Sequence, residues 1–400
     1  DFLAQAARTL LSQGVNMGGC NSVPAPTASE APPAATVQKE EVKKVEEVKG
    51  YAATKAGCEN MAPISFTRYT PGDEDISFDI KFCGICHTDV HFVNNDLGNA
   101  VYPLCPGHEL VGTVTAVGSK VTNFKLGDNI GVGCFVDACL ECGPCGKGYK
   151  QYCEKGMTMT YGNPKKHGRC GPDDGNMTMG GYSNKFVVHE KFGVKVPAGA
   201  DLPRTAPLLC AGVTVFEPLV AHGCKEGGKN IGIVGLGGLG MMGIKLAAAM
   251  GNTVTAISTS SSKEAAAKAC GATSFVVSSD AEAMKAATGS LDLILDTVAA
   301  HHELGPLLDM LNARGKLVLQ GLVAKPMAFS SPQLIFSQKC ITASLIGGMP
   351  RTQEMMDFCM EKEIYADVEV VSKEKITECL LAMQSSLGDV KRFVIDCSTF

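Results

Sequence analysis

Several features that would indicate other classes of protein are missing from this chain of 400 residues. The formal net charge is only −5, and the lysines and arginines form no basic patch, which argues against a nucleic-acid partner. No apolar run is long enough to span a bilayer, and no repeat has a solenoid period. What the chain does have is the length for more than one domain and a hydrophobic fraction of 45%, enough for two cores.

A secretory apolar segment is also missing, which bears on the 18 cysteines. In a reducing compartment, clustered cysteines are more often metal ligands than disulfides. Two-residue spacing lets several thiolates converge on one ion, and four thiolates leave no open position, as in a structural zinc site. Two disulfides or an iron–sulfur cluster are the alternatives. The four cysteines with this spacing are Cys139, Cys142, Cys145 and Cys153.

Three separate fragments predict a second metal site. They are Cys86 in CGICHTD, His108 in PGHEL and Cys210 in LLCAG. Two thiolates and one imidazole are the three ligands of a catalytic zinc with one open position, and Asp89 is suited to accept the other ring N–H of the histidine. The alternative is that the two cysteines are small buried hydrophobes and the histidine is a core residue. Twelve further cysteines, Cys134 among them, receive no role.

A nucleotide-binding signal begins at Ile231. The apolar run IGIV has the character of a strand, GLGGLG supplies a tight turn, MMGIKLAAAMG favours a helix, and NTVTAIS is typical of a second strand. This order predicts a dinucleotide site with pyrophosphate at the helix N-terminus. A glycine-rich turn that only packs helix on sheet is the alternative. The predicted cofactor-binding residues of the turn are Gly235, Gly237, Gly238, Leu239 and Gly240.

The segment after the second strand favours NADP over NAD. NAD sites place an acid here for the ribose 2′-OH, but no acid lies between Asn252 and Lys263. Hydroxyls and one positive charge suit a 2′-phosphate instead, although serines also favour a solvated helix N-cap. The predicted phosphate-binding residues are Ser258, Thr259, Ser260 and Lys263.

Together these motifs resemble the zinc-dependent medium-chain alcohol dehydrogenases, most closely the cinnamyl alcohol dehydrogenase group. The match runs from about Gly50 to Phe400, through GICHTDVH, YPLCPGHELVG, the four-cysteine lobe, APLLCAG, VGLGGLG, STSSSK, GKLVLQG and RFVID. The resemblance implies an α/β fold, in which a Rossmann-type doubly wound parallel sheet domain accompanies a β-rich GroES-like catalytic domain. It also implies two zinc ions (Zn2+) per chain, NADP(H), and a homodimer joined through the cofactor domains.

The resemblance assigns roles to further residues. Glu109 matches a carboxylate that can approach the catalytic zinc. Thr88, His91 and Asp96 match proton-relay positions, where a proton passes from the substrate oxygen through the cofactor ribose toward the histidine. A surface histidine without such a role is the alternative for His91.

Four segments are expected along the chain. Residues 1–50 form a disordered or targeting segment, and residues 51–210 form the first part of the catalytic zinc domain, with a structural zinc lobe at 134–155. Residues 211–345 form the dinucleotide-binding domain. By resemblance, residues 346–400 return to the catalytic domain, and the active site lies between the domains.

These observations predict a zinc-dependent NADP(H) oxidoreductase that interconverts primary alcohols and aldehydes. The chain has no tryptophan, which lignin-type members of the group carry shortly after the last structural cysteine, and Leu345 stands where they tend to have phenylalanine. A broader range of aromatic and aliphatic aldehydes is therefore expected. The alternative is a catalytically silent NADP-binding protein with a structural or sensing role.

The localisation expected is cytoplasmic, with two alternatives that depend on the N-terminal segment. The sequence begins with Asp1, but MGGCNS at residues 17–22 matches an acylation pattern, so Gly18 and Cys20 could carry lipids if Met17 were the initiator. Membrane anchoring depends on this acylation. A membrane-tethered interaction module is a further alternative for the function, and it rests on the same pattern. The Ala, Ser and Pro richness up to Ser29 also fits an organelle transit peptide.

Overall fold

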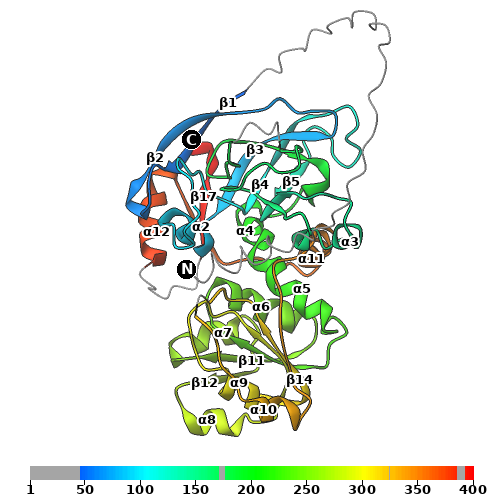
Figure 1. Ribbon diagram of the computed structural model, residues 1–400, viewed down its shortest axis with the longest axis vertical. Coiled ribbons are helices and arrows are strands. Elements are labelled where there is room, and N and C mark those ends of the chain that lie inside the picture. Colours follow the sequence, from blue (N-terminus) through cyan, green and yellow to red (C-terminus); the bar gives the residue numbers. More distant parts are fainter. Residues whose placement is uncertain (1–45, 171–175, 324, 385–391) are drawn as a thin grey trace, which may run out of the picture. The chain divides into compact units, whose positions relative to one another are not determined.

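The structure is a computed structural model that describes residues 46–170, 176–323, 325–384 and 392–400 (Figure 1). The predicted acylation pattern at residues 17–22 lies outside the described residues. Strand β1 (Glu46–Ala53) pairs antiparallel with β2 (Met61–Arg68) over its full length. The strand pairing therefore begins before the expected boundary at residue 50, because the end of the charge-dense run contributes Val48, which is fully buried.

A seven-stranded sheet contains β3 (Asp75–Gly84), which pairs antiparallel with β4 (Leu110–Val117). Alternate residues of β3, such as Ile76 and Phe78, bury large side chains in one core. The strand order is β16-β17-β3-β4-β5-β9, with β8 also on β3. The remaining strands of this sheet are β5 (Asn129–Val132), β8 (Lys185–His189), β9 (Val194–Val196), β16 (Val368–Val371) and β17 (Arg392–Asp396). A small separate sheet pairs β6 (Phe135–Asp137) with β7 (Thr158–Met159).

A second, six-stranded sheet is parallel throughout, in the order β12-β11-β10-β13-β14-β15. Successive strands alternate with helices along the chain, and Figure 1 shows that these strands and helices form one group of elements. The strand order reverses between β10 and β13, the switch point at which doubly wound sheets bind ligands. The strands are β10 (Asn230–Val234), β11 (Thr253–Ser258), β12 (Ser274–Val277), β13 (Leu291–Asp296), β14 (Leu311–Leu319) and β15 (Cys340–Ala343).

Helix α5 (Ala211–Ala221) connects the two sheets along the chain and is buried over most of its length. Its core cluster contains Val111 and Val194 of the first sheet as well as Ile233 of the second, so the packing is continuous on both sides of residue 210. The other helices are α2 (His87–Asn94), α3 (Gly143–Gly146), α4 (Leu202–Thr205), α6 (Gly238–Ala249), α7 (Glu264–Ala269), α8 (Ala281–Ala286), α9 (Gly305–Met310), α10 (Ser331–Ile335), α11 (Met349–Glu361) and α12 (Ile376–Gln384). Short 3₁₀ helices lie at Cys58–Asn60, Lys150–Tyr152, Glu190–Phe192, Ala206–Leu209, Ser261–Lys263, Lys373–Lys375 and Cys397–Thr399.

Among the described residues, no single helix is long and apolar enough to cross a membrane. One bent pair, Leu202–Leu209 with Ala211–Ala221, meets the criterion of length and composition together.

Candidate active site

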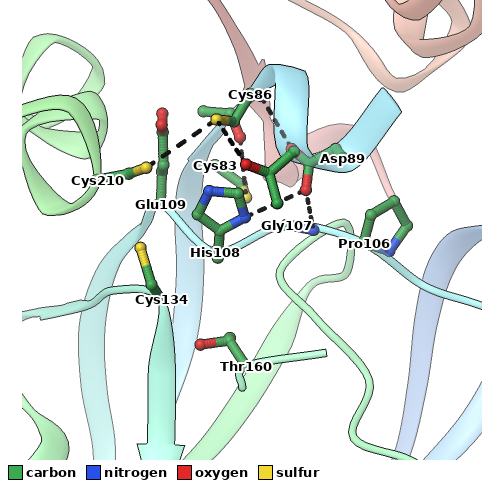
Figure 2. Close-up of polar contacts among 12 residues, drawn as sticks. Cys83, Cys86, Asp89, Pro106, Gly107, His108, Glu109, Cys134, Thr160 and Cys210 are labelled. Atoms are coloured by element: carbon green, nitrogen blue, oxygen red, sulfur yellow. Dashed lines mark hydrogen bonds and ion pairs between the residues drawn. The ribbon is translucent and has the colours of Figure 1, made fainter. Parts of the chain in front are cut away.

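The three predicted ligands of the catalytic zinc lie together in space. One ligand atom from each of Cys86, His108 and Cys210, with a carboxylate oxygen of Glu109, lies within 4.8 Å of the others. The two sulfur atoms are 4.0 Å apart. Figure 2 shows the two thiols and the imidazole directed toward one another. Side chains that are far apart in the sequence thus form one cluster of sulfur, nitrogen and oxygen ligand atoms.

Each ligand comes from a junction between elements. Cys86 is the N-cap of α2, two residues after the end of β3. His108 lies two residues before β4, and Cys210 lies between the 3₁₀ helix Ala206–Leu209 and α5. A capping box with Asp89 fixes the first turn of α2, since the Asp89 side chain accepts the backbone N–H of Cys86 at 2.9 Å. Local capping therefore sets the direction of one thiol.

Asp89 orients the histidine and is itself held by three donors. Its Oδ1 lies 3.2 Å from His108 Nδ1, and it is fully buried. It accepts hydrogen bonds from the backbone N–H groups of Cys86 and Gly107 and from the hydroxyl of Tyr182 at 3.1 Å. Because Nδ1 contacts Asp89, Nε2 is the ring nitrogen left for the thiol cluster, the outer-shell arrangement of a ligating histidine.

The cluster fits zinc in its donor chemistry. The hydrogen bond from the Cys210 thiol lowers the pKa of Cys86 well below its usual range. Burial raises the pKa of Glu109 to about 8, an effect that the guanidinium of Arg392 partly offsets. Glu109 Oε2 is a buried side-chain atom without a hydrogen-bond partner among the described residues. Two thiols, an imidazole and a spare carboxylate oxygen are the ligand types that zinc takes in proteins.

Two residues at this site were missed by the sequence interpretation. Cys134 follows β5 and points its sulfur toward the cluster (Figure 2), where hydrogen bonding with the Cys210 thiol lowers the pKa of Cys134. Arg392 forms a buried ion pair with Glu109. Neither residue carries a spacing signal in the sequence, because each reaches the site only through the register of the seven-stranded sheet.

The three predicted relay residues lie on or just after α2. Thr88 Oγ1 is 3.7 Å from Cys86 Sγ, so Thr88 borders the metal cluster. His91 Nδ1 is 2.7 Å from Asp96 Oδ2, and both of these side chains are exposed. Thr88 and His91 are three residues apart in one helix and therefore share a face. The structure thus places one end of the predicted relay at the cluster and the other at the surface.

The four-cysteine lobe forms a separate cluster. Ligand atoms of all four cysteines lie within 4.8 Å of one another. The backbone N–H groups of Cys139 and Cys142 donate to the sulfurs of Cys153 and Cys139 at 3.4 Å. Such bonds stabilise thiolates. The backbone N–H of Glu141 contributes most to lowering the pKa of Cys139 to about 6. All four are free thiols rather than disulfides.

The glycine turn has the backbone geometry of a phosphate-binding loop. Gly235 follows β10 with a φ of 86°, and Gly237 is the N-cap of α6. A Cβ on Gly240 would collide with the carbonyl oxygen of Gly235, so only glycine allows this close approach of helix and strand. Gly238 and Leu239 form the first turn of α6, whose backbone N–H groups are free for an anion.

The predicted 2′-phosphate residues follow β11, the strand beside β10. Ser258 ends the strand, and Thr259 and Ser260 are exposed. Lys263 turns back toward the glycine loop, since its Nζ donates to the carbonyl of Leu236 at 3.1 Å. The ammonium group of Lys263 therefore lies beside the glycine loop, and the hydroxyl-bearing residues lie between Lys263 and the end of β11 in the chain.

Comparison with known proteins agrees with this geometry. An alcohol dehydrogenase GroES-like domain matches residues 72–198, and a zinc-binding dehydrogenase domain matches residues 238–361. A probable mannitol dehydrogenase of Mesembryanthemum crystallinum is 47% identical over 84% of this chain and 91% of its own length. Cinnamyl alcohol dehydrogenase 8 of Arabidopsis thaliana is 46% identical over 84% of this chain and 91% of its own length. The chain belongs to the zinc-dependent medium-chain alcohol dehydrogenases.

Within this family the chain is of the cinnamyl alcohol dehydrogenase type, and solved structures agree. A cinnamyl alcohol dehydrogenase from Sorghum bicolor superimposes with a TM-score of 0.83 at 41% identity and covers 88% of this chain and 98% of its own. The enzyme from Helicobacter pylori, complexed with NADP(H), gives 0.81 at 34% identity, over 89% and 99% of the two chains. The predicted fold class is confirmed, as is the prediction of an alcohol and aldehyde oxidoreductase. The alternative of a catalytically silent protein is not favoured.

Proposed function

We propose that this alcohol dehydrogenase uses NADP(H) and holds two zinc ions in each chain. Cys86, His108 and Cys210 would hold the catalytic ion, and the four-cysteine lobe would hold the structural one. The observation that carries the proposal is the convergence of two thiols and one imidazole within 4.8 Å, beside a fourth group, Glu109, that is not needed for three ligands. The hydroxyls near Lys263 support NADP(H), as does the cofactor of the Helicobacter pylori relative.

The bound groups would supply Lewis-acid polarisation of a carbonyl or alcohol oxygen from zinc, and hydride chemistry from the nicotinamide. The chain's own residues prepare the site for this. Asp89 holds the tautomer and ring orientation of His108. Thr88 Oγ1, beside the cluster, can donate or accept a proton at the substrate oxygen. His91, supported by Asp96, offers a group that exchanges protons with solvent.

Primary alcohols and aldehydes of a broad aromatic and aliphatic range are the proposed substrates. Relatives named as mannitol and cinnamyl alcohol dehydrogenases are almost equally similar to this chain, which supports a range wider than phenylpropenyl alcohols. The absence of tryptophan removes the largest aromatic side chain from any pocket wall. A panel of aromatic and aliphatic aldehydes with NADPH would rank them.

A homodimer formed through the parallel sheet is also proposed. Strand β15 is the last strand of that sheet, so its outer edge has no strand partner within the described part of the chain. Large apolar side chains at the end of α10, shortly before this strand in the chain, are exposed, among them Phe336 at 88% and Ile335 at 71%. An unpaired edge flanked by exposed apolar groups favours pairing with a second copy. Sedimentation velocity would contradict this proposal if the chain were monomeric at micromolar concentration.

The catalytic assignment is tested by removing a ligand. Cys210→Ala or His108→Ala should abolish aldehyde reduction with little loss of NADPH binding, measured by nucleotide fluorescence. Zinc-free protein that still turned over would refute the assignment. His91→Ala should lower turnover mainly at neutral pH, so an unchanged pH profile would exclude the relay role.

A further inference from the structure

The backbone is strained at one residue close to the metal cluster. Ile346 has a φ of 39°, in the left-handed region that β-branched residues rarely adopt. Such conformations persist only where the surrounding structure enforces them, and they concentrate at functional sites. Contacts with neighbouring residues must therefore stabilise this conformation of Ile346.

Ile346 lies beside residues that neighbour the catalytic cluster. It lines a small cavity together with Cys134 and Leu209. Leu209 directly precedes the ligand Cys210, and the sulfur of Cys134 lies beside the cluster in Figure 2. The conformation at Ile346 therefore shapes a cavity wall that also includes the residue before the ligand Cys210.

The contacts that hold this wall come from the four-cysteine lobe. The backbone N–H of Leu345 donates to the hydroxyl of Tyr152 at 3.1 Å, and Tyr152 directly precedes the lobe's last cysteine. On the other side of Ile346, Gly348 packs so tightly against the carbonyl oxygen of Gly148 that a Cβ there would collide with it. One short segment, residues 148–152, thus contacts the chain on both sides of Ile346.

We propose that Tyr152 is a positioning residue, through which the four-cysteine lobe fixes the Leu345–Ile346 wall of the substrate site. The inference rests on the proposed function, because the wall matters only if aldehydes bind beside it. The hydroxyl of Tyr152 does not touch the metal cluster. It acts through the backbone of Leu345, so its loss should loosen the wall without removing any ligand.

The consequence differs between substrates. A large aromatic aldehyde would contact the wall, whereas acetaldehyde would fit without it. The net contribution of one hydrogen bond typically corresponds to about a five-fold change in the equilibrium constant for the conformation that it stabilises. Tyr152→Phe should therefore raise the KM for a large aromatic aldehyde about five-fold, with kcat and the KM for acetaldehyde nearly unchanged.

The matched control is Tyr149→Phe. Tyr149 lies on the same lobe with a similar exposure, 43% against 45% for Tyr152. The full chain, loaded with zinc, should be compared as wild type and both variants by steady-state kinetics with NADPH. Hydrogen exchange should be followed by mass spectrometry at the peptide that contains Leu345. Exchange there should be faster in Tyr152→Phe only, with zinc content unchanged in both variants.

The outcomes separate the inference from the function on which it rests. Unchanged exchange at Leu345, or faster exchange without a selective rise in KM, would overturn the positioning role while wild-type activity stood. A rise in KM of equal size in Tyr149→Phe would also overturn it. A wild type that reduced no aldehyde would refute the proposed function and the inference together, even if exchange at Leu345 responded.

Discussion

Arg392 of β17 donates from its Nη2 to Oε1 of Glu109, a residue 283 positions earlier in the chain. The carboxylate is fully buried and the guanidinium nearly so. Arg392 also packs against Gly238, where a Cβ would meet its side chain at 3.0 Å. One side chain therefore lies between the carboxylate of the metal cluster and the first turn of the helix that is expected to bind the cofactor pyrophosphate.

Removing this guanidinium should destabilise the protein more than the loss of a surface ion pair. Arg392→Leu leaves Glu109 buried without its partner. Above pH 8, where the raised pKa of Glu109 allows the carboxylate to be charged, breaking a buried pair from one side costs about 3–5 kcal/mol. The free energy of unfolding in urea, measured with zinc present, should fall by that amount. Binding of NADPH should weaken as well, because the positive charge beside α6 is lost.

The control for this prediction is the double variant Glu109→Gln with Arg392→Leu. Neutralising the carboxylate removes the uncompensated charge, so the double variant should be more stable than Arg392→Leu alone. Destabilisation equal to the sum of the two single variants would show that the residues act independently.

The Asp89 network should control metal affinity. Asp89→Asn keeps the size of the side chain but removes the charge that faces His108 Nδ1. Loss of an outer-shell carboxylate typically weakens metal binding by about 10–100-fold. Titration with a zinc chelator should show this loss at one of the two proposed zinc ions. Tyr182→Phe, which removes only one donor to Asp89, should give a smaller effect in the same titration.

Much of the metal chemistry could be predicted from the sequence because the ligand motifs are local. Cys86, His108 and Cys210 are residue types that zinc binds, and their fragments occur together with a four-cysteine motif whose two-residue spacing is typical of a zinc site. The glycine turn was equally readable, since strand, turn and helix follow one another directly.

What could not be predicted depends on sheet register and long-range packing. Arg392 meets Glu109 only because β17 pairs beside β3, which no local pattern reveals. Cys134 was one of many cysteines without a spacing signal, and the lobe boundary at 134–155 included it, although its sulfur lies at the other cluster. The pairing of β1 from Glu46 was hidden by a charge-dense run that is typical of disordered segments.

Cofactor preference should depend on Lys263. Its Nζ already lies at the glycine loop, so Lys263→Ala should weaken NADPH binding about ten-fold, as expected for a lost hydrogen bond to a charged group, while NADH binding stays nearly the same. Lys268→Ala is the matched control, because Lys268 pairs with Glu264 on the next helix. Ser258→Asp should shift the ratio of kcat/KM further toward NADH, since a carboxylate repels the 2′-phosphate. An unchanged ratio in both Lys263→Ala and Ser258→Asp would contradict the NADP assignment.

The two sulfur clusters should lose metal independently. Cys145→Ser removes one of four thiols that leave no open position, so one zinc per chain should be lost and the free energy of unfolding should fall by more than about 4 kcal/mol. Cys134→Ser is the matched control: this thiol is not one of the ligand atoms that meet within 4.8 Å in either cluster, so both zinc ions should stay. Metal content by plasma mass spectrometry and unfolding in urea measure the two effects. Loss of zinc from Cys134→Ser would mean that the Cys134 sulfur takes part in ligation as a fourth ligand, and the three-ligand site with one open position would then be wrong.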